Sequence, residues 1–180
     1  LAQKISRLTE SFRLGNAIKR GIPVAIVGAT NAGKSTLLNA LLGEERAIVS
    51  DLEGTTRDTI EEVLNVEGIT FRFIDTAGLR TTTDAIEALG IERSYDKMAS
   101  ATIVLLMMDG TRLEDKAYLS SIQDLMPRLS EVSYLVLLNK ADLLEPSRIT
   151  ELLSPTSPLR QLFPEGTALL SLSAKEGLGI

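Results

Sequence analysis

Residues 24–35 read VAIVGATNAGKS, a short apolar run followed by the pattern GxxxxGK[ST]. This pattern, placed between a strand and a helix, is typical of a loop that binds phosphate through its backbone N–H groups. The glycines let successive amides turn inward, and the helix that follows adds the positive end of its dipole. Lys34 can neutralise the β- and γ-phosphates, and the Ser35 hydroxyl can bind Mg²⁺. The alternative is a glycine-rich turn with a surface lysine.

The composition restricts the chemistry that this loop can serve. The 180 residues include 19 basic and 24 acidic side chains, so the net charge is −5, and 44% are apolar. The absence of Cys and His excludes disulfides, thiolate or imidazole metal ligands and Ser-His-Asp triads. The acidic balance argues against this piece alone binding a nucleic-acid backbone. We expect no membrane span, since the apolar runs are too short.

From Pro23 onward, apolar strands alternate with segments of helical length. The expected strands are 24–27, 59–66, 69–74, 102–108, 134–138 and 168–172, and the expected helices are 34–42, closed by Gly43, 85–98 and 114–128. Four of the six prolines fall in 146–164, which predicts a broken helix and loop there. The pattern indicates an α/β fold with a mostly parallel six-stranded sheet, helices on both faces, and an antiparallel edge formed by the 59–74 hairpin.

Residues 1–20 are predicted to form a helix, since Leu1, Ile5, Leu8 and Phe12 form one apolar stripe. That stripe either packs on the following domain or belongs to a flanking helical domain. Residues 21–180 then form one domain, and we expect that its last covering helix is missing.

A second motif, DTAG at residues 75–78, follows the expected strand 69–74. A carboxylate at that strand end would lie beside the phosphate loop, so Asp75 is predicted to hold Mg²⁺ through water and the Gly78 amide to contact the γ-phosphate. By itself, such an aspartate is also common as a turn or cap residue.

The motif NKAD at residues 139–142 follows the expected strand 134–138. The Asp142 carboxylate can accept hydrogen bonds from N1–H and the exocyclic amino group of guanine, a donor pair that adenine lacks. Lys140 would lay its aliphatic stem along the base, and backbone amides of residues 173–175 (SAK) would meet the guanine O6. Asp142 therefore argues for GTP and against a P-loop kinase or ATPase.

The polar segment 54–58, GTTRD, lies where a loop would order around the γ-phosphate and Mg²⁺, with Thr56 as metal ligand. A solvated Thr-rich loop is the alternative. Leu79 follows DTAG at the position where Ras-like enzymes carry a glutamine that orients the attacking water. Leucine cannot do so, and another group must take that role.

Together these motifs, with DTAGLR and the run GIER at 90–93, resemble the G domain of the bacterial tRNA-modification GTPase family MnmE (TrmE), within the TrmE-Era-EngA-like GTPases. The resemblance covers residues 22–180 and implies a Ras-like P-loop GTPase fold. It also implies a K⁺ ion in place of an arginine finger, held by Asn31 and by backbone carbonyls at Ser50 and Leu52, and a water oriented by Glu87. From composition alone, Glu87 would be a solvated helix residue.

The predicted catalytic residues are Glu87, Thr56, Lys34 and Gly78. The predicted Mg²⁺ ligands are Ser35, Thr56 and Asp75. The residues predicted to contact GTP, GDP or the K⁺ beside it are Asn31, Ala32, Gly33, Lys34, Ser35, Thr36, Ser50, Thr55, Thr56, Asp75, Gly78, Asn139, Lys140, Asp142, Ser173, Ala174 and Lys175.

The resemblance implies a cytoplasmic, K⁺-activated and Mg²⁺-dependent GTP hydrolase whose G domains pair in the transition state. In the whole protein it would serve modification of the tRNA wobble uridine, with the FAD protein MnmG as partner and tRNA bound by other domains. The family's folate-binding domain and C-terminal Cys motif are not in this sequence. The alternative is a regulatory switch of the Der or Era type that acts in ribosome assembly.

Overall fold

The computed structural model describes residues 21–44, 61–74 and 98–180. The expected helix at 1–20 and nearly all of the expected helix at 85–98 lie outside these residues. Strands are β1 (Ile22–Val27), β2 (Glu62–Val66), β3 (Ile69–Phe73), β4 (Ile103–Asp109), β5 (Ser133–Asn139) and β6 (Leu169–Ser171). Helices are α2 (Lys34–Glu44), α5 (Lys116–Gln123), α6 (Met126–Leu129) and α7 (Pro146–Leu153), with 3₁₀ turns η1 (Gly110–Arg112), η2 (Ala141–Leu143) and η3 (Arg160–Leu162). Within the described part, no helix combines the length and apolarity needed to cross a bilayer.

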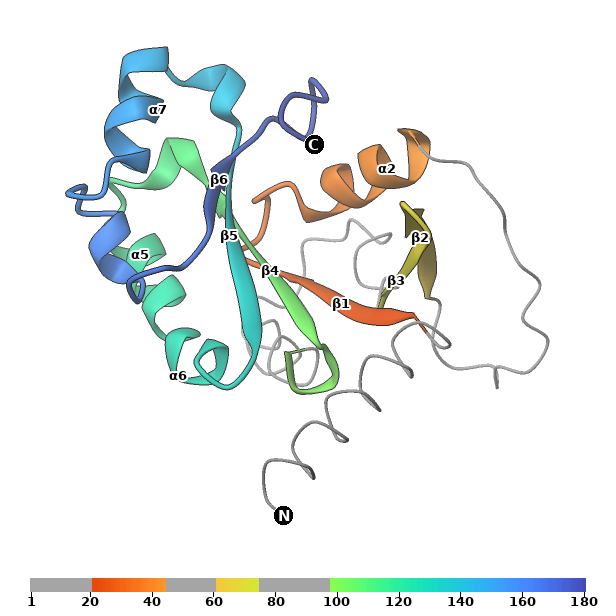
Figure 1. Cartoon of the computed structure of the whole chain (residues 1–180). Coiled ribbons are helices and arrows are strands. Elements are labelled where there is room, and N and C mark those ends of the chain that lie inside the picture. Colours follow the sequence, from red (N-terminus) through yellow and green to blue (C-terminus); the bar gives the residue numbers. More distant parts are fainter. Residues whose placement is uncertain (1–20, 45–60, 75–97) are drawn as a thin grey trace.

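The six strands form one sheet in the order β2-β3-β1-β4-β5-β6 (Figure 1). Neighbouring strands are parallel except β2 and β3, which form the antiparallel edge. The predicted mixed sheet is therefore confirmed. Strand β1 lies between β3 and β4, so the strands that follow it along the chain lie first on one side of it and then on the other. Ligands of open α/β sheets bind outside the carboxyl ends of the strands at such a point.

The antiparallel edge turns at Glu67-Gly68, the two residues left between the expected strands 59–66 and 69–74. Both residues have positive φ, 51° and 83°, which matches the twist of a two-residue hairpin. The Asn65 side chain accepts a hydrogen bond from the Gly68 amide at 3.0 Å and closes the turn.

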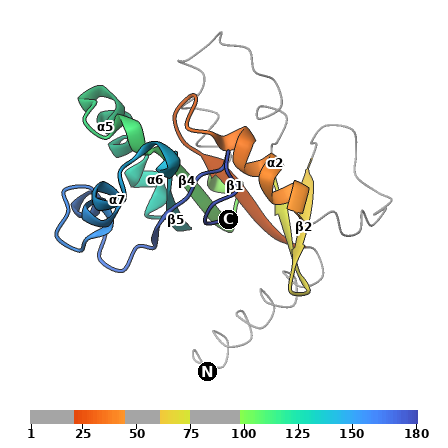
Figure 2. The ribbon, with the colours of Figure 1, turned by 90° about the horizontal axis from the view of Figure 1, so that it is seen from above.

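Alternate side chains of the strands pack on opposite faces of the sheet, because successive residues of a strand point to opposite sides. Figure 2 shows α2 on one side and α5, α6 and α7 on the other. The α2 face buries Val24 and Ile26 of β1 with Leu37 and Leu38 of the helix. The opposite face buries Ala25, Val27, Val104, Leu106, Met108, Tyr118, Ile122, Leu129, Val136, Leu138 and Leu152. These two cores hold the sheet rigidly beneath the loops at its carboxyl edge.

Two helix predictions were wrong in detail. The expected helix at 114–128 is two helices, α5 and α6. Asp115 caps the start of α5 and accepts a hydrogen bond from the Tyr118 amide, and Pro127 lies in the first turn of α6. Pro lacks the amide that a continuous helix would use at this position. Helix α2 does not end before Gly43 but continues to Glu44. One glycine in a last turn weakens a helix without necessarily ending it.

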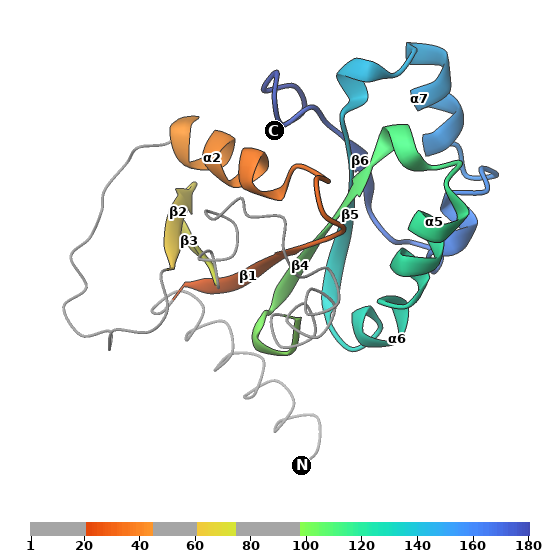
Figure 3. The same ribbon diagram turned by 180° about the vertical axis from the view of Figure 1, so that it is seen from behind.

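Most remaining boundaries differ by a residue or two, and β2 begins at Glu62 where the expected strand began at 59, two residues of which lie outside the described part. Strand β4 runs on to Asp109 and β5 to Asn139, while the expected break at 146–164 is confirmed as α7 followed by a loop and η3. Figure 3, seen from behind, shows the C-terminal segment after β6 returning toward α2. The three loops that follow β1, β5 and β6 therefore meet at one edge of the sheet.

Candidate nucleotide-binding site

The loop between β1 and α2 contains two positions where both the backbone conformation and the neighbouring atoms require glycine. Gly28 has φ 148° and Gly33 has φ 98°, conformations that side chains rarely adopt. A Cβ at Gly28 would overlap the backbone carbonyl of Met107 on β4, and one at Gly33 would overlap the amide of Asn139. Asn31 also has positive φ, 61°, and its side chain is exposed. The predicted phosphate loop is therefore an intact turn whose backbone passes close to β4 and β5.

Lys34 lies across this loop. Its ammonium group donates hydrogen bonds to the carbonyls of Gly28 at 2.9 Å and Ala29 at 2.7 Å. Lys34 and Ser35 begin α2, where backbone N–H groups at a helix start favour anions. A phosphate held at this loop would therefore meet backbone amides and a cation that the loop itself orients.

Asn139 joins the phosphate loop to the C-terminal segment. Its side chain is 3% exposed, donates to the Ala32 carbonyl at 2.8 Å and accepts from the Ala174 amide at 2.9 Å. Both ends of the amide are therefore used, and three loops are held in one arrangement. Sequence analysis did not foresee this bridging role, and the direct contact of Asn139 with nucleotide stays a prediction.

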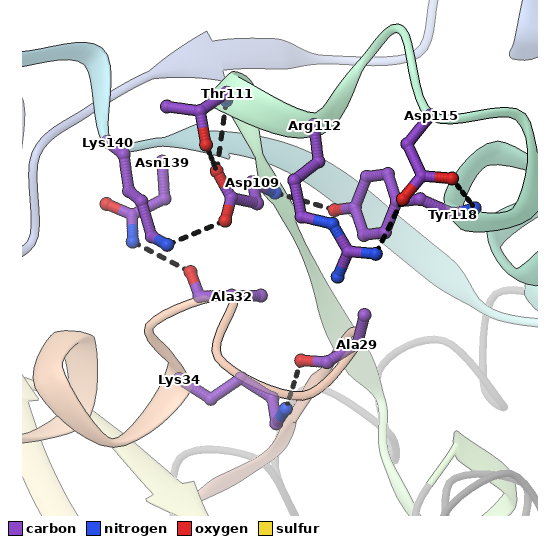
Figure 4. A network of polar contacts seen from close by, with 10 residues as sticks. All are labelled: Ala29, Ala32, Lys34, Asp109, Thr111, Arg112, Asp115, Tyr118, Asn139 and Lys140. Atoms are coloured by element: carbon purple, nitrogen blue, oxygen red, sulfur yellow. Dashed lines mark hydrogen bonds and ion pairs between the residues drawn. The ribbon is translucent and has the colours of Figure 1, made fainter. Parts of the chain in front are cut away.

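Lys140 directly precedes η2, and Asp142 lies within it. Lys140 has φ 64°, and its ammonium forms an ion pair with Asp109 at 2.6 Å (Figure 4). The Asp142 side chain is exposed within η2. The predicted base-contacting lysine and the guanine-selecting carboxylate thus lie next to the loop held by Asn139.

Residues 173–175 complete this side of the site. Ser173 and Ala174 are buried, and their amides donate to Leu178 at 2.9 Å and to Asn139 at 2.9 Å. Lys175 is exposed, and its amide has no acceptor among the residues that the structure describes. Of the three amides predicted to contact the guanine O6, that of Lys175 is therefore the one still available, because the other two already donate hydrogen bonds within the chain.

The predicted residues Ser50, Leu52, Thr55, Thr56, Asp75, Gly78 and Glu87 lie outside the described residues. Among the residues that are described, no three His, Cys, Asp or Glu side chains group to hold a metal. Two of the three predicted Mg²⁺ ligands, Thr56 and Asp75, are outside this part of the chain. Ser35, half-buried at the start of α2, is the described residue that could bind Mg²⁺.

The family model described as 50S ribosome-binding GTPase matches residues 23–140 of this chain. That range contains the phosphate loop, all but one strand of the sheet, and the first two residues of NKAD. The chain belongs to the family of 50S ribosome-binding GTPases. It is therefore a GTP-binding, GTP-hydrolysing domain, and the predicted Ras-like P-loop fold is confirmed.

Curated relatives make the assignment narrower. The chain is 51% identical to the tRNA modification GTPase MnmE of Porphyromonas gingivalis over 185 residues, which covers 98% of this chain and 37% of the relative. It is 53% identical to the MnmE of Parabacteroides distasonis, covering 100% of this chain and again 37% of the relative. The chain thus spans little more than a third of the length of these relatives.

Solved structures agree with the fold. The chain matches Era in complex with MgGDPNP and nucleotides of 16S ribosomal RNA with a TM-score of 0.62 and 30% identity, over 87% of this chain and 52% of Era. An Aquifex aeolicus Era variant bound to GDP and AlF4⁻ matches with the same TM-score at 29% identity, over the same shares.

Sequence reasoning missed Asp109, although it is a buried carboxylate beside the site. The expected strand ended with the apolar run at residue 108, so Asp109 was placed in the loop that follows. The register pairs Asp109 with Asn139, and this pairing could be anticipated only from the order of β4 and β5 in the sheet. Burial disfavours the charged form, yet hydrogen bonds from Lys140 and Thr111 and the lysine charge hold the pKa of Asp109 below its usual value.

Proposed function

We propose that this GTPase domain is K⁺-activated and Mg²⁺-dependent and that it serves a protein that modifies the wobble uridine of tRNA. The observation that carries the nucleotide part is the Asn139 bridge between the phosphate loop and residues 173–175. It supports one continuous site in which phosphate and guanine are bound together. The tRNA part is supported by relatives at about half identity named tRNA modification GTPase MnmE.

The residues of the chain would divide the work of hydrolysis. Amides of residues 28–35 and the Lys34 ammonium bind and orient the phosphates, while Asp142 selects guanine. Ser35, Thr56 and Asp75 would hold Mg²⁺, and Asn31 with the carbonyls of Ser50 and Leu52 would hold K⁺. Bound cations supply charge that stabilises the developing negative charge on the transferred phosphoryl group. Glu87 would orient the attacking water.

The K⁺ part is supported by Asn31, whose exposed amide stands in the phosphate loop at positive φ. Replacing KCl with NaCl should lower GTP turnover by about tenfold or more, because Na⁺ does not take the position of K⁺ and stabilises the transition state less. GDP affinity should stay nearly unchanged. Phosphate release in the two salts measures the turnover. Asn31→Ala should remove the difference, and equal turnover of the parent in both salts would contradict the proposal.

Pairing of G domains is the accompanying proposal. With GDP and aluminium fluoride in KCl, light scattering should report a dimer, whereas GDP alone should leave a monomer. A monomer under both conditions would contradict pairing through the nucleotide face. In the whole protein, the partner MnmG, tRNA binding by other domains, and a cytoplasmic location belong to the same proposal.

Asp142 carries the selection of guanine. Asp142→Asn should shift preference from guanosine toward xanthosine nucleotides, because the amide can donate to the xanthine O2 where the carboxylate accepted from the guanine amino group. Competition between GDP and XDP for a fluorescent nucleotide measures the change. Unchanged preference for GDP would remove this assignment.

A switch that regulates ribosome assembly is the second candidate, supported by the likeness to Era bound to 16S ribosomal RNA. The tRNA-modification reading has stronger support, because relatives of that name are 51–53% identical and Era is 30% identical. Sedimentation of the protein with ribosomal subunits in a GTP analogue, but not in GDP, would favour the switch.

A further inference from the structure

Asp109 and Asn139 are register partners at the carboxyl ends of β4 and β5. Lys140, the next residue, reaches back across the two strands, and its ammonium lies 2.6 Å from the Asp109 carboxylate. The Asp109 side chain is 5% exposed, and that of Lys140 is 32% exposed. The ion pair therefore joins a buried carboxylate to a partly exposed lysine side chain (Figure 4).

The Asp109 carboxylate is fixed independently of Lys140. One oxygen accepts hydrogen bonds from the Thr111 amide at 3.0 Å and the Thr111 hydroxyl at 2.6 Å. The Asp109 amide donates to the Tyr118 hydroxyl at 2.6 Å. The second carboxylate oxygen remains for Lys140. The anchor is thus held in place by η1 and α5 before any ligand is bound.

The lysine is restrained at both ends by this arrangement. Its backbone has the left-handed conformation, and the following amide, of Ala141, donates to the Leu172 carbonyl at 3.1 Å. A free lysine side chain samples many rotamers, and ordering it upon binding reduces affinity. The ion pair orders the stem in advance.

We propose that Asp109 is a positioning residue of the nucleotide site: it holds the Lys140 ammonium so that the aliphatic stem stands ready as a wall for the purine base. The inference rests on the proposed contact between Lys140 and the base. It assigns nucleotide affinity to a carboxylate that touches no part of the nucleotide. The competing interpretation is that the ion pair only joins the ends of β4 and β5.

A double-mutant cycle separates these interpretations. Asp109→Asn keeps the size and the acceptor for Thr111 but removes the charge that holds Lys140, and Lys140→Met keeps an unbranched apolar stem without the ammonium. Each variant should bind a fluorescent GDP analogue about tenfold more weakly, mainly through faster dissociation. The double variant should bind no more weakly than Lys140→Met, because Asp109 acts through the lysine.

Thermal unfolding in the same buffers monitors folding. Lys140→Met leaves a buried charge unpaired and should lower Tm, and Asp109→Asn added to it should restore much of that loss. Asp115→Asn is the matched control, because Asp115 pairs with Arg112 at 2.7 Å and belongs to the same segment without contacting Lys140. It should leave GDP affinity unchanged.

The inference would be overturned if either single variant bound the GDP analogue as tightly as the parent. It would also be overturned if Asp109→Asn lowered the affinity equally in the parent and in Lys140→Met. If Asp109→Asn does not fold, Lys140→Met alone still decides, because parent-like affinity would show that the anchored ammonium is not needed. Failure of the parent to bind GDP would instead overturn the proposed function together with this inference.

Discussion

Gly33 shows how a single position serves the site. It needs glycine both for its φ of 98° and because Asn139 occupies the space where a Cβ would stand. Asn139 uses that space to hold the Ala32 carbonyl, so the missing side chain of one residue makes room for the bridging side chain of another. The conformation of the phosphate loop and the position of the guanine motif are coupled there.

Gly33→Ala should destabilise the fold by about 1–3 kcal/mol, because it combines backbone strain with displacement of Asn139. The matched control is Gly43→Ala in α2, where nothing lies within 4 Å of an added Cβ. That change should stabilise the protein by about 0.5–1 kcal/mol through lower unfolded-state entropy. Urea unfolding of both variants measures the difference, and equal effects would contradict this account of Gly33.

Strand β4 and helix α5 are joined through Tyr118. The ring is 3% exposed, its hydroxyl accepts the Asp109 amide, and the Arg112 guanidinium lies 4.7 Å from the ring centroid. Burial raises the pKa of Tyr118 from 10.0 to about 12. The first helix after β4 is thus attached to the strand end that carries the Asp109 anchor.

Because the folded state holds the Tyr118 proton more tightly than the unfolded state, this group's contribution to stability is fully present below pH 10. It is lost as the pH rises from about 10 toward 12. At pH 8, Tyr118→Phe should therefore lower the free energy of unfolding by about 1–3 kcal/mol, because the buried Asp109 amide loses its hydrogen-bond acceptor. The gap should narrow above pH 10, as urea midpoints would show, and a constant gap would contradict the assignment.

In the whole molecule, three loops from separate strands form one site on a sheet with two packed faces. The loops after β1 and β5 and the segment after β6 share the Asn139 bridge. A ligand that contacts all three binds the folded chain and not the unfolded one, so binding must raise the free energy of unfolding.

MgGDP at about one hundred times its dissociation constant should stabilise the fold by about 2.7 kcal/mol. Thermal unfolding with MgGDP against MgADP measures this, because adenine does not match the Asp142 carboxylate. Equal stabilisation by the two nucleotides would contradict guanine selection, whereas no stabilisation by either would contradict the nucleotide site.

The sequence alone determined the sheet and the chemical class of the site. Apolar runs of strand length, separated by helical segments, allow few ways of burying both faces, and GxxxxGK[ST] and NKAD carry their chemistry within a few neighbouring residues. The Glu67-Gly68 turn was predictable for the same reason, because turn geometry depends on local φ preferences.

Only the tertiary structure decided which side chains from distant parts of the chain are in contact. Asp109 was not recognised from the sequence, and neither was the bridge that Asn139 forms between two loops. Both roles depend on β4 lying next to β5 in a register that pairs these two residues. The split between α5 and α6 also escaped prediction, since the apolar spacing continues through Pro127. Hydrogen bonds and ion pairs between residues 31 to 107 positions apart depend on the packed sheet, and no local pattern encodes them.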